Sequence, residues 1–173
     1  KAARVMVKCS PMLDISLAIS QLTSVREVHV VSVGNECKEL LLILGGATGR
    51  GIEVRTVNFQ GGGVQTFDYA LEEEQAASCS YTSTVGRYLY EPNSSMMKAG
   101  CFRLPAGRYG LQKLHRNTHL YTSGTLVPDF PGRVFEVKNI DGFGNIDVIF
   151  LEIIIDIASG NIIFVQKHES SVV

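Results

Sequence analysis

The chain is organised around residues 4–44, RVMVKCSPMLDISLAISQLTSVREVHVVSVGNECKELLLIL. Its opening run is apolar and β-rich, which is typical of a parallel strand buried on both faces. Asp14 is a candidate N-cap, because the apolar residues behind it recur at the spacing of one helical face. Residues 26–33 and 37–44 are two β-rich runs, and the turn between them is short enough to force an antiparallel pair. The stretch therefore predicts a strand, a helix and a hairpin, in that order.

Such a unit cannot close a core by itself, because a parallel strand needs a parallel neighbour that a crossover connection supplies. We expect those neighbours upstream, since the chain begins at Lys1 almost inside the first strand. The sequence thus predicts the C-terminal piece of a longer protein, in which residues 1–60 end a doubly wound α/β sheet.

Several long strings in this sequence resemble one protein family. They are Arg4–Asp14, Val28–Leu42, Tyr88–Gly100, Leu114–Ser123 and Val127–Val137. Together they resemble a bacterial family of class I S-adenosylmethionine-dependent methyltransferases that carry a ferredoxin-like domain and a C-terminal THUMP-like domain.

The resemblance implies that residues 4–44 are the fifth strand, the fifth helix and the reversed final hairpin of the catalytic sheet. Residues 61–138 would be the ferredoxin-like domain, an α+β unit. Residues 139–173 do not match a THUMP-like domain, and we expect a truncated or divergent tail there that contains one more hairpin. The resemblance also implies that the parent protein uses S-adenosylmethionine and acts on RNA. The donor-binding residues would lie upstream, this chain would hold no catalytic residue, and alone it would be inactive.

Composition fits part of a cytoplasmic protein. The formal charge is −1, 45% of the residues are hydrophobic, and no apolar run reaches the roughly 20 residues that span a bilayer. The sequence has no secretory signal either, so we expect no membrane association. The four cysteines are dispersed, which favours reduced, packed thiols over a disulfide framework. Nothing in the sequence predicts an oligomeric state.

A basic segment provides the candidate RNA-binding residues. Between Arg87 and Lys138, eight lysines and arginines face three acidic residues. Neutralisation of phosphates together with stacking of bases on aromatic side chains would use such a segment. The candidate substrate contacts are Arg103, Arg108, Lys113, Arg116 and His119, and the candidate stacking residues are Tyr88, Tyr90, Phe102, Tyr109 and Tyr121. The alternative is a solvated face over an aromatic core.

Four other motifs suggest sites that their context disfavours. Gly45–Gly51 is glycine-rich, but a strand pattern follows it, whereas a phosphate loop must open a helix. Glu72–Glu74 is read as a solvated helix start. Glu91-Pro92-Asn93 could contact an anion, although capping of a helix explains it as well. His115–His119 has the spacing of two metal ligands but lacks the accompanying glutamate or cysteine pair, so we expect no metal.

Two local expectations concern the connections. The Ser/Thr-rich residues 78–84 are read as a loop that could contain a domain boundary, and Pro105, Gly107 and Gly110 are expected to break a helix before Leu111.

Two functions are therefore open. The first is a piece of an RNA methyltransferase that completes the catalytic sheet and holds substrate. The alternative is a non-catalytic module that binds RNA or protein.

Overall fold

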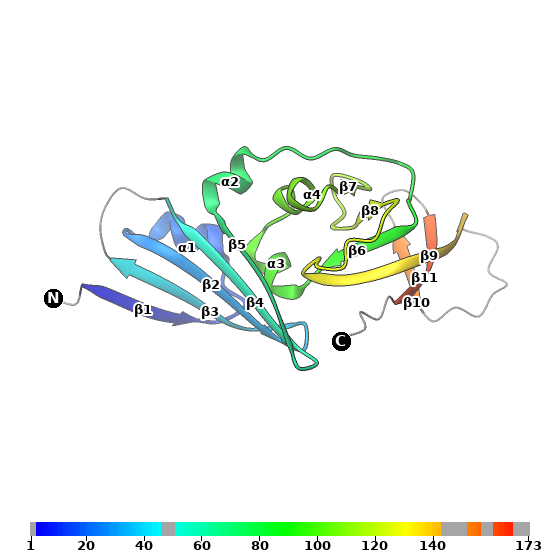
Figure 1. The fold of residues 1–173 in the computed structure, drawn as a ribbon. Coiled ribbons are helices and arrows are strands. Elements are labelled where there is room, and N and C mark those ends of the chain that lie inside the picture. The colour runs from blue at the N-terminus through cyan, green and yellow to red at the C-terminus, as the bar shows by residue number, and fades with distance from the viewer. Residues whose placement is uncertain (1–2, 46–50, 143–151, 157–160, 168–173) are drawn as a thin grey trace. The chain divides into compact units, whose positions relative to one another are not determined.

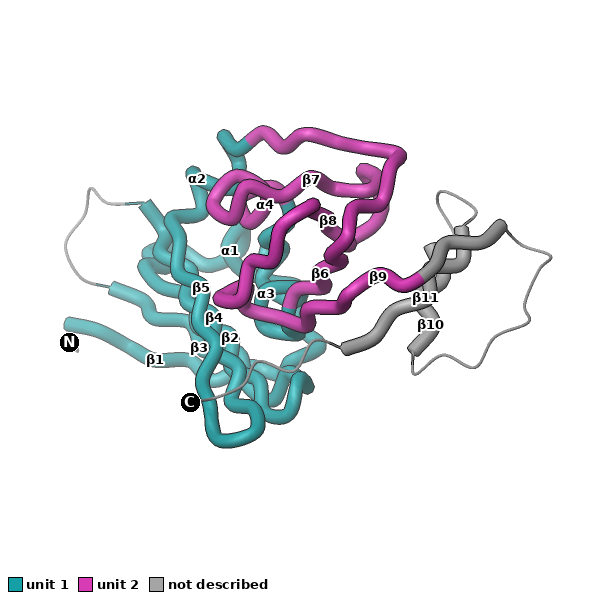
Figure 2. Tube along the Cα trace, turned by 45° about the vertical axis from the view of Figure 1, so that its right-hand side comes forward, with its two compact units in different colours: residues 1–77, 93–102 teal, residues 78–92, 103–173 magenta. Residues whose placement is uncertain are grey.

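The computed structural model describes residues 3–45, 51–142, 152–156 and 161–167, with side chains up to residue 138. Its contacts divide the chain into two compact units (Figures 1 and 2). The first unit contains residues 1–77 and 93–102, and the second contains residues 78–92 and 103–173. Both units mix helices and sheet, which confirms the predicted α/β and α+β class.

Among the described elements of the first unit, seven follow one another along residues 1–77. The eighth, a helix, lies in residues 93–102, after the chain has passed through part of the second unit. These are β1 (Arg4–Cys9), α1 (Ile15–Gln21), β2 (Val25–Val33), β3 (Glu36–Gly45), β4 (Glu53–Gln60), β5 (Gly63–Ala70), α2 (Leu71–Ala76) and α3 (Ser94–Ala99).

The strand, helix and hairpin predicted for residues 4–44 are confirmed. Asp14 caps α1, since its Oδ1 accepts a hydrogen bond from the Leu17 N–H at 2.9 Å. Gly34 and Asn35 turn the β2–β3 hairpin with φ of 59° and 62°. A two-residue turn with positive φ at both positions matches the right-handed twist of the strands, which explains the tight antiparallel pairing.

The strand order of the first sheet is β1-β3-β2-β4-β5. Strand β3 runs antiparallel to both β1 and β2, so these two flanking strands are parallel to each other. The β4–β5 hairpin extends the sheet through parallel pairing of β4 with β2.

Strand β1 does not match the expectation of a strand buried on both faces. Within the described residues it lies at the sheet edge, pairs with β3 alone and has mostly exposed side chains. Within the described residues, the apolar side chains Val5 and Met6 of this strand are exposed.

One face of the first sheet carries the core of this unit. It includes Val28, Val30, Leu40, Leu42, Val54, Phe67 and Tyr69, none more than 4% exposed. Helix α3 packs on β2, β3 and β4, and its Met96 is fully buried. Helix α1 buries Ala18 alone.

Hydrogen bonds link α3 to polar groups of the sheet on which it packs. Ser95 Oγ lies 2.7 Å from Ser32 Oγ and 2.6 Å from the Val57 carbonyl oxygen, and all of these groups lie under the helix. The Ser94 N–H donates to Asn35 Oδ1 at 2.8 Å. Because buried polar groups are costly when unpaired, this network fixes where α3 sits on the sheet.

Glu74 corrects the reading of the acidic run. Glu72, Glu73 and Glu74 do form the first turn of α2, but Glu74 is 7% exposed. Its Oε1 accepts from the Phe102 N–H at 3.1 Å, and the Cys101 thiol lies 3.5 Å from its Oε2. This carboxylate is therefore an internal acceptor for the segment that follows α3, not part of a solvated helix start.

The second unit is built on a six-stranded sheet of order β10-β11-β9-β6-β8-β7. Its elements are β6 (Tyr88–Pro92), α4 (Leu104–Tyr109), β7 (Gln112–Lys113), β8 (Tyr121–Ser123), β9 (Gly132–Gly142), β10 (Glu152–Asp156) and β11 (Asn161–Lys167). The hairpin expected in the tail is present as β10 and β11, and β11 also pairs with β9.

The core of the second unit is aromatic. The Phe130 ring lies at its centre. The ring centroids of Tyr90, Tyr109 and Tyr121 lie 5.3, 5.4 and 6.1 Å from the Phe130 centroid. The buried Tyr90 hydroxyl donates to the Thr125 carbonyl at 2.9 Å and accepts from the Val127 N–H at 3.0 Å. Satisfying this hydroxyl removes the penalty of burying it.

Pro105 and Gly107 do not break a helix. They lie inside α4, where Pro105 occupies the first turn and needs no N–H donor. The break expected at Gly110 is confirmed, since α4 ends there and Gly110 takes the left-handed conformation.

The expected division at residue 60 falls in the turn of the β4–β5 hairpin. The paired strands keep β5 and α2 in the first unit, and the division follows Ala77, at the start of the Ser/Thr-rich segment. Among the helices of the described ranges, none is long and apolar enough to cross a bilayer, and α1 has seven residues. The structure describes all four cysteines, and none of them is in a disulfide.

Candidate nucleic-acid interface

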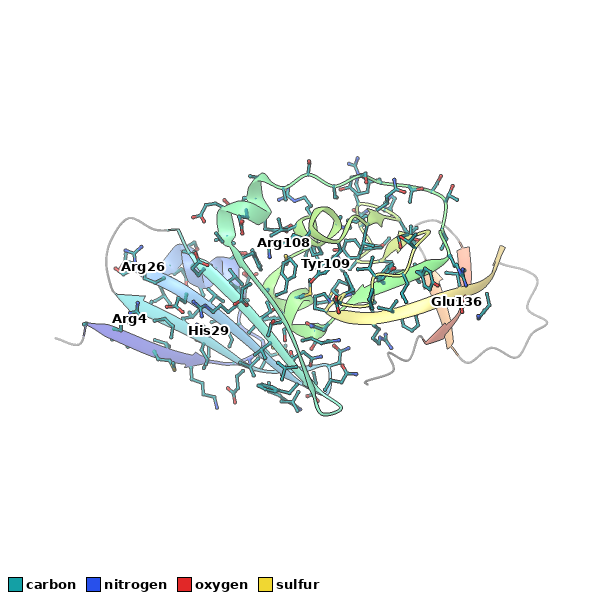
Figure 3. All side chains as sticks on the ribbon, viewed as in Figure 1. Arg4, Arg26, His29, Arg108, Tyr109 and Glu136 are labelled. Atoms are coloured by element: carbon teal, nitrogen blue, oxygen red, sulfur yellow. The ribbon has the colours of Figure 1, made fainter. Side chains whose placement is uncertain are left out.

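The second unit contains all five candidate RNA contacts. Arg103 is the N-cap of α4, and Arg108 is exposed in its last turn (Figure 3). Lys113 is on β7, while Arg116 and His119 lie in the connection from β7 to β8. The expected strand-to-strand connection around the two histidines is confirmed, and His115 Nδ1 accepts from the Asn117 N–H at 3.2 Å.

Lys113 is not placed as a surface contact. Lys113 is only 2% exposed, and its Nζ lies 5.9 Å from the centroid of the Tyr121 ring. This geometry is a cation–π contact inside the unit. The ammonium group therefore serves the interior, and the expectation that it meets a phosphate is wrong for this conformation.

His119 is half-buried, and burial lowers the pKa of its imidazole, with the charge of Lys113 acting in the same direction. A lowered pKa favours the neutral ring at physiological pH. His119 thus contributes a hydrogen-bonding group to this region more than a positive charge.

Other basic residues of the segment are ion-paired. Arg87 lies 3.1 Å from the Glu136 carboxylate, which Lys138 also contacts. Together these cations lower the pKa of Glu136, with the Lys138 hydrogen bond as the largest cause. Arg133 pairs with Glu91 across β6 and β9. These charges are largely neutralised locally.

The motif Glu91-Pro92-Asn93 is likewise used by the fold. Glu91 pairs with Arg133, and the Asn93 side chain accepts from the Met96 N–H at 3.1 Å as the N-cap of α3. The capping interpretation is therefore confirmed.

Three of the aromatic residues expected to stack on bases are core residues. Tyr90 and Tyr121 are fully buried, and Tyr88 is 9% exposed. The residue that the sequence reading missed is Tyr81, whose side chain is 50% exposed. The signal that could have found it is a lone aromatic in the Ser/Thr-rich run SCSYTST, where no apolar pattern gives it a place in a core.

Tyr81 is held by its backbone at the edge of the second sheet. Its neighbours Ser80 and Thr82 are both bonded to Lys113: the Lys113 N–H donates to the Ser80 carbonyl at 3.0 Å, and the Thr82 N–H donates to the Lys113 carbonyl at 2.9 Å. The ring is thus fixed at its base and open to solvent.

A hydrogen bond with the Cys79 thiol is the largest cause that raises the pKa of Tyr81, and the positive charges of Arg116 and Arg103 act against this rise. Arg116 also lines a pocket together with Tyr81. One residue named from the sequence thus lies beside an exposed ring that was not predicted.

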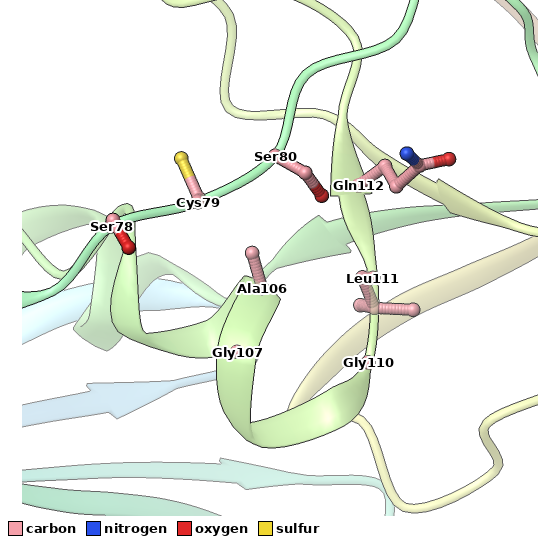
Figure 4. A pocket seen from close by; sticks show the side chains of 8 residues that line it. All are labelled: Ser78, Cys79, Ser80, Ala106, Gly107, Gly110, Leu111 and Gln112. Carbon is pink, nitrogen blue, oxygen red and sulfur yellow. The ribbon is translucent and has the colours of Figure 1, made fainter.

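Two pockets flank the segment that carries Tyr81. One, of about 300 Å³, lies between residues 78–80 and α4 with the start of β7, and Ala106 points toward this segment (Figure 4). The other, of about 320 Å³, is lined by Tyr81, Thr82, Ser83, Leu114, His115 and Arg116. The second pocket combines an aromatic ring, hydroxyls, an imidazole and a guanidinium group, which are the groups that bind nucleotides.

In the part of the chain that the structure describes, no three ligating side chains come close enough together to hold a metal ion. The Asp14 side chain in the β1–α1 connection caps α1 through its Oδ1. The glycine-rich residues 46–50 lie outside the described residues, and the next described element after β3 is strand β4.

Comparisons with known proteins agree with this architecture. Residues 88–131 match a ferredoxin-like domain family, within the range predicted for such a domain. The chain is also similar to the crystal structure of a protein from Porphyromonas gingivalis W83 that is described as a "putative methyltransferase". The identity is 38% and the TM-score 0.77, over 82% of this chain and 36% of that one. No match was found among curated proteins. The chain thus spans about a third of the length of the solved structure that it resembles and includes a match to the ferredoxin-like domain family.

Proposed function

We propose that this chain is the C-terminal part of an S-adenosylmethionine-dependent methyltransferase that acts on RNA. In this proposal the first unit completes the catalytic sheet, and the second unit holds the substrate. The observation that carries the proposal is the strand order β1-β3-β2, with β3 reversed between two mutually parallel strands. This arrangement is what the methyltransferase resemblance implies for the last strands of the catalytic sheet.

Exposed apolar side chains at β1 and α1 support a sheet that continues beyond β1. The relevant residues are Val5, Met6, Met12, Leu17 and Leu22, which are 39–89% exposed. An edge strand with exposed apolar side chains promotes association, so proteins normally cover or charge such an edge. A neighbouring strand and helix from an upstream part would cover both features.

S-adenosylmethionine would supply the methyl group in the complete protein. As the methyltransferase resemblance implies, we place the donor-binding residues upstream, and we expect this chain alone to be inactive. The proposed protein acts in the cytoplasm, where RNA and the donor are available.

The RNA role draws support from the second unit. Arg108 and Arg116 are exposed there, and Arg116 lines a pocket together with Tyr81. Arginine is suited to phosphates because its planar guanidinium group donates two parallel hydrogen bonds.

The test is transfer of a labelled methyl group from S-adenosylmethionine to RNA. It compares this chain with the protein expressed from the complete gene. We expect the longer protein to label RNA and the 173-residue chain to label none. Turnover by the short chain alone would contradict the proposal. RNA binding by the longer protein without methyl transfer would favour the alternative, a non-catalytic binding module.

A further inference from the structure

The pocket lined by Tyr81 contains an exposed aromatic ring, the ring of Tyr81 itself. The backbone bonds of Ser80 and Thr82 to Lys113 fix the segment on both sides of Tyr81, so little conformational entropy is lost when a ligand contacts the ring. A fixed, half-exposed aromatic ring is a stacking platform for a planar group.

The pocket has the size and composition of a site for a small ligand. Its volume of about 320 Å³ is at the lower end of the roughly 300–1,000 Å³ found for small-molecule sites. None of its lining residues is acidic. Thr82 and Ser83 add hydroxyl groups, and Leu114 adds an apolar wall. A single nucleotide fits this description better than a longer segment of chain does.

Charge favours an anion at the rim of the pocket. Arg116 is exposed and, within the described residues, forms no ion pair. Arg103 reinforces the positive potential at the Tyr81 hydroxyl. A phosphate attached to a base on the Tyr81 ring would therefore meet a guanidinium group without displacing a carboxylate.

Stacking on Tyr81 restricts the kind of RNA. In a duplex, both faces of each internal base are stacked and its edge is paired, so the base cannot reach a protein ring. An unpaired base has a free face and pays no such cost.

We propose that the pocket formed by Tyr81, Thr82, Ser83, Leu114, His115 and Arg116 binds one unpaired nucleotide of RNA, with its base on the Tyr81 ring and its phosphate on Arg116. This inference rests on the proposed role of the second unit in holding RNA, and it names the form of RNA that the unit selects.

The experiment measures binding of a labelled single-stranded RNA and of the same strand in a duplex to the full 173-residue chain by fluorescence anisotropy. Three variants are compared: Tyr81→Leu removes the ring, Tyr81→Phe keeps it, and Arg116→Gln removes the charge. Arg87→Gln is the matched control, because it removes the same charge at a residue paired with Glu136. Circular dichroism melts verify that each variant is folded.

Single-stranded RNA should bind the wild type more tightly than the duplex does. Tyr81→Leu should weaken that binding by about 5- to 150-fold, the effect of losing one stacked base. Tyr81→Phe should bind like the wild type. Arg116→Gln should weaken binding and reduce its salt dependence by about one phosphate contact, whereas Arg87→Gln should have a smaller effect.

Two results would overturn the inference, and they are distinguishable. If RNA binds but Tyr81→Leu binds as the wild type does, or the duplex binds equally well, the pocket does not select an unpaired nucleotide, although the RNA role stands. If neither form of RNA binds the chain at any salt concentration, the RNA role of the second unit fails as well.

Discussion

The centre of the first sheet and its β1 edge differ in how far their apolar surface is covered. At the centre, where α3 packs on β2, β3 and β4, Met96 and Val28 are fully buried. At the open end, β1 pairs on one side within the described residues, and Met6 and Met12 are 65% and 89% exposed. Contacts within this chain therefore complete the core at the centre. At the open end apolar side chains are left exposed, and we propose that the upstream part of a methyltransferase covers them.

Truncation of one methionine at the centre and one at the open end gives the largest contrast in stability. Met96→Ala should lower the free energy of unfolding by about 2–5 kcal/mol, because it leaves a cavity under α3. Met6→Ala should change it by less than about 0.5 kcal/mol, because the side chain is mostly in water. Urea unfolding of this chain, followed by circular dichroism, measures both.

The same Met6→Ala substitution in the longer protein sharpens the comparison. There we expect a loss of about 2 kcal/mol or more, since Met6 would then lie in a covered core. An equally small effect in both proteins would mean that no further part covers the open end.

Two serines allow a second, smaller contrast. Ser95→Ala removes the hydrogen bonds that the Ser95 hydroxyl makes with Ser32 Oγ and the Val57 carbonyl beneath α3, and it should cost about 1–3 kcal/mol. Ser20→Ala removes a hydroxyl that donates to the Leu17 carbonyl on the exposed α1, and it should cost less than about 0.5 kcal/mol. Equal unfolding midpoints for the two variants would show that the network does not hold α3.

The smallest expected effect concerns an ion cluster that links β1, β2 and β4. The Glu27 carboxylate lies 3.0 Å from His29 Nε2 and 3.7 Å from both Arg4 and Arg55. The hydrogen bond with His29 is the main cause that lowers the pKa of Glu27 below its ordinary value of 4.5.

A carboxyl group with a lowered pKa in the folded state stabilises the protein above its unfolded pKa, and this contribution is lost as the pH falls through the folded value. Glu27→Gln should therefore lower stability near neutral pH by less than about 1 kcal/mol, and the difference should disappear in acid. Urea midpoints of both proteins, from neutral pH down to about pH 3, measure this. A constant difference across that range would contradict it.

The strands and helix of residues 4–44 could be predicted because local chemistry determines them. Asp14 caps a helix with apolar periodicity, and Gly34 with Asn35 makes a two-residue turn. What could not be predicted are features that depend on distant partners. Glu74 is buried because Cys101 and Phe102 return to it after more than 25 residues. The open edge of β1 agrees with the expectation that its neighbours lie upstream, but the exposure of its side chains could not be predicted, because an apolar strand looks the same in sequence whether or not it is covered.

The candidate site was predicted in part for the same reason. Arg103 and Arg116 were named from local charge, and the fold places Arg116 in a pocket with Tyr81. Lys113 was also named, but the Tyr121 ring holds it inside. Counting aromatic residues favoured Tyr90 and Tyr121, which form the core, whereas Tyr81 is presented by pairing with a strand more than 30 residues away.

The most direct test of the proposed role of the first sheet is hydrogen exchange of the β1 amides, Arg4–Cys9. It compares this chain with the protein expressed from the complete gene. In the short chain, the amides that point away from β3 should exchange rapidly, because no strand accepts their hydrogen bonds. The account predicts that these amides become strongly protected in the longer protein, where a parallel strand pairs with β1. Equally rapid exchange in both proteins would contradict it.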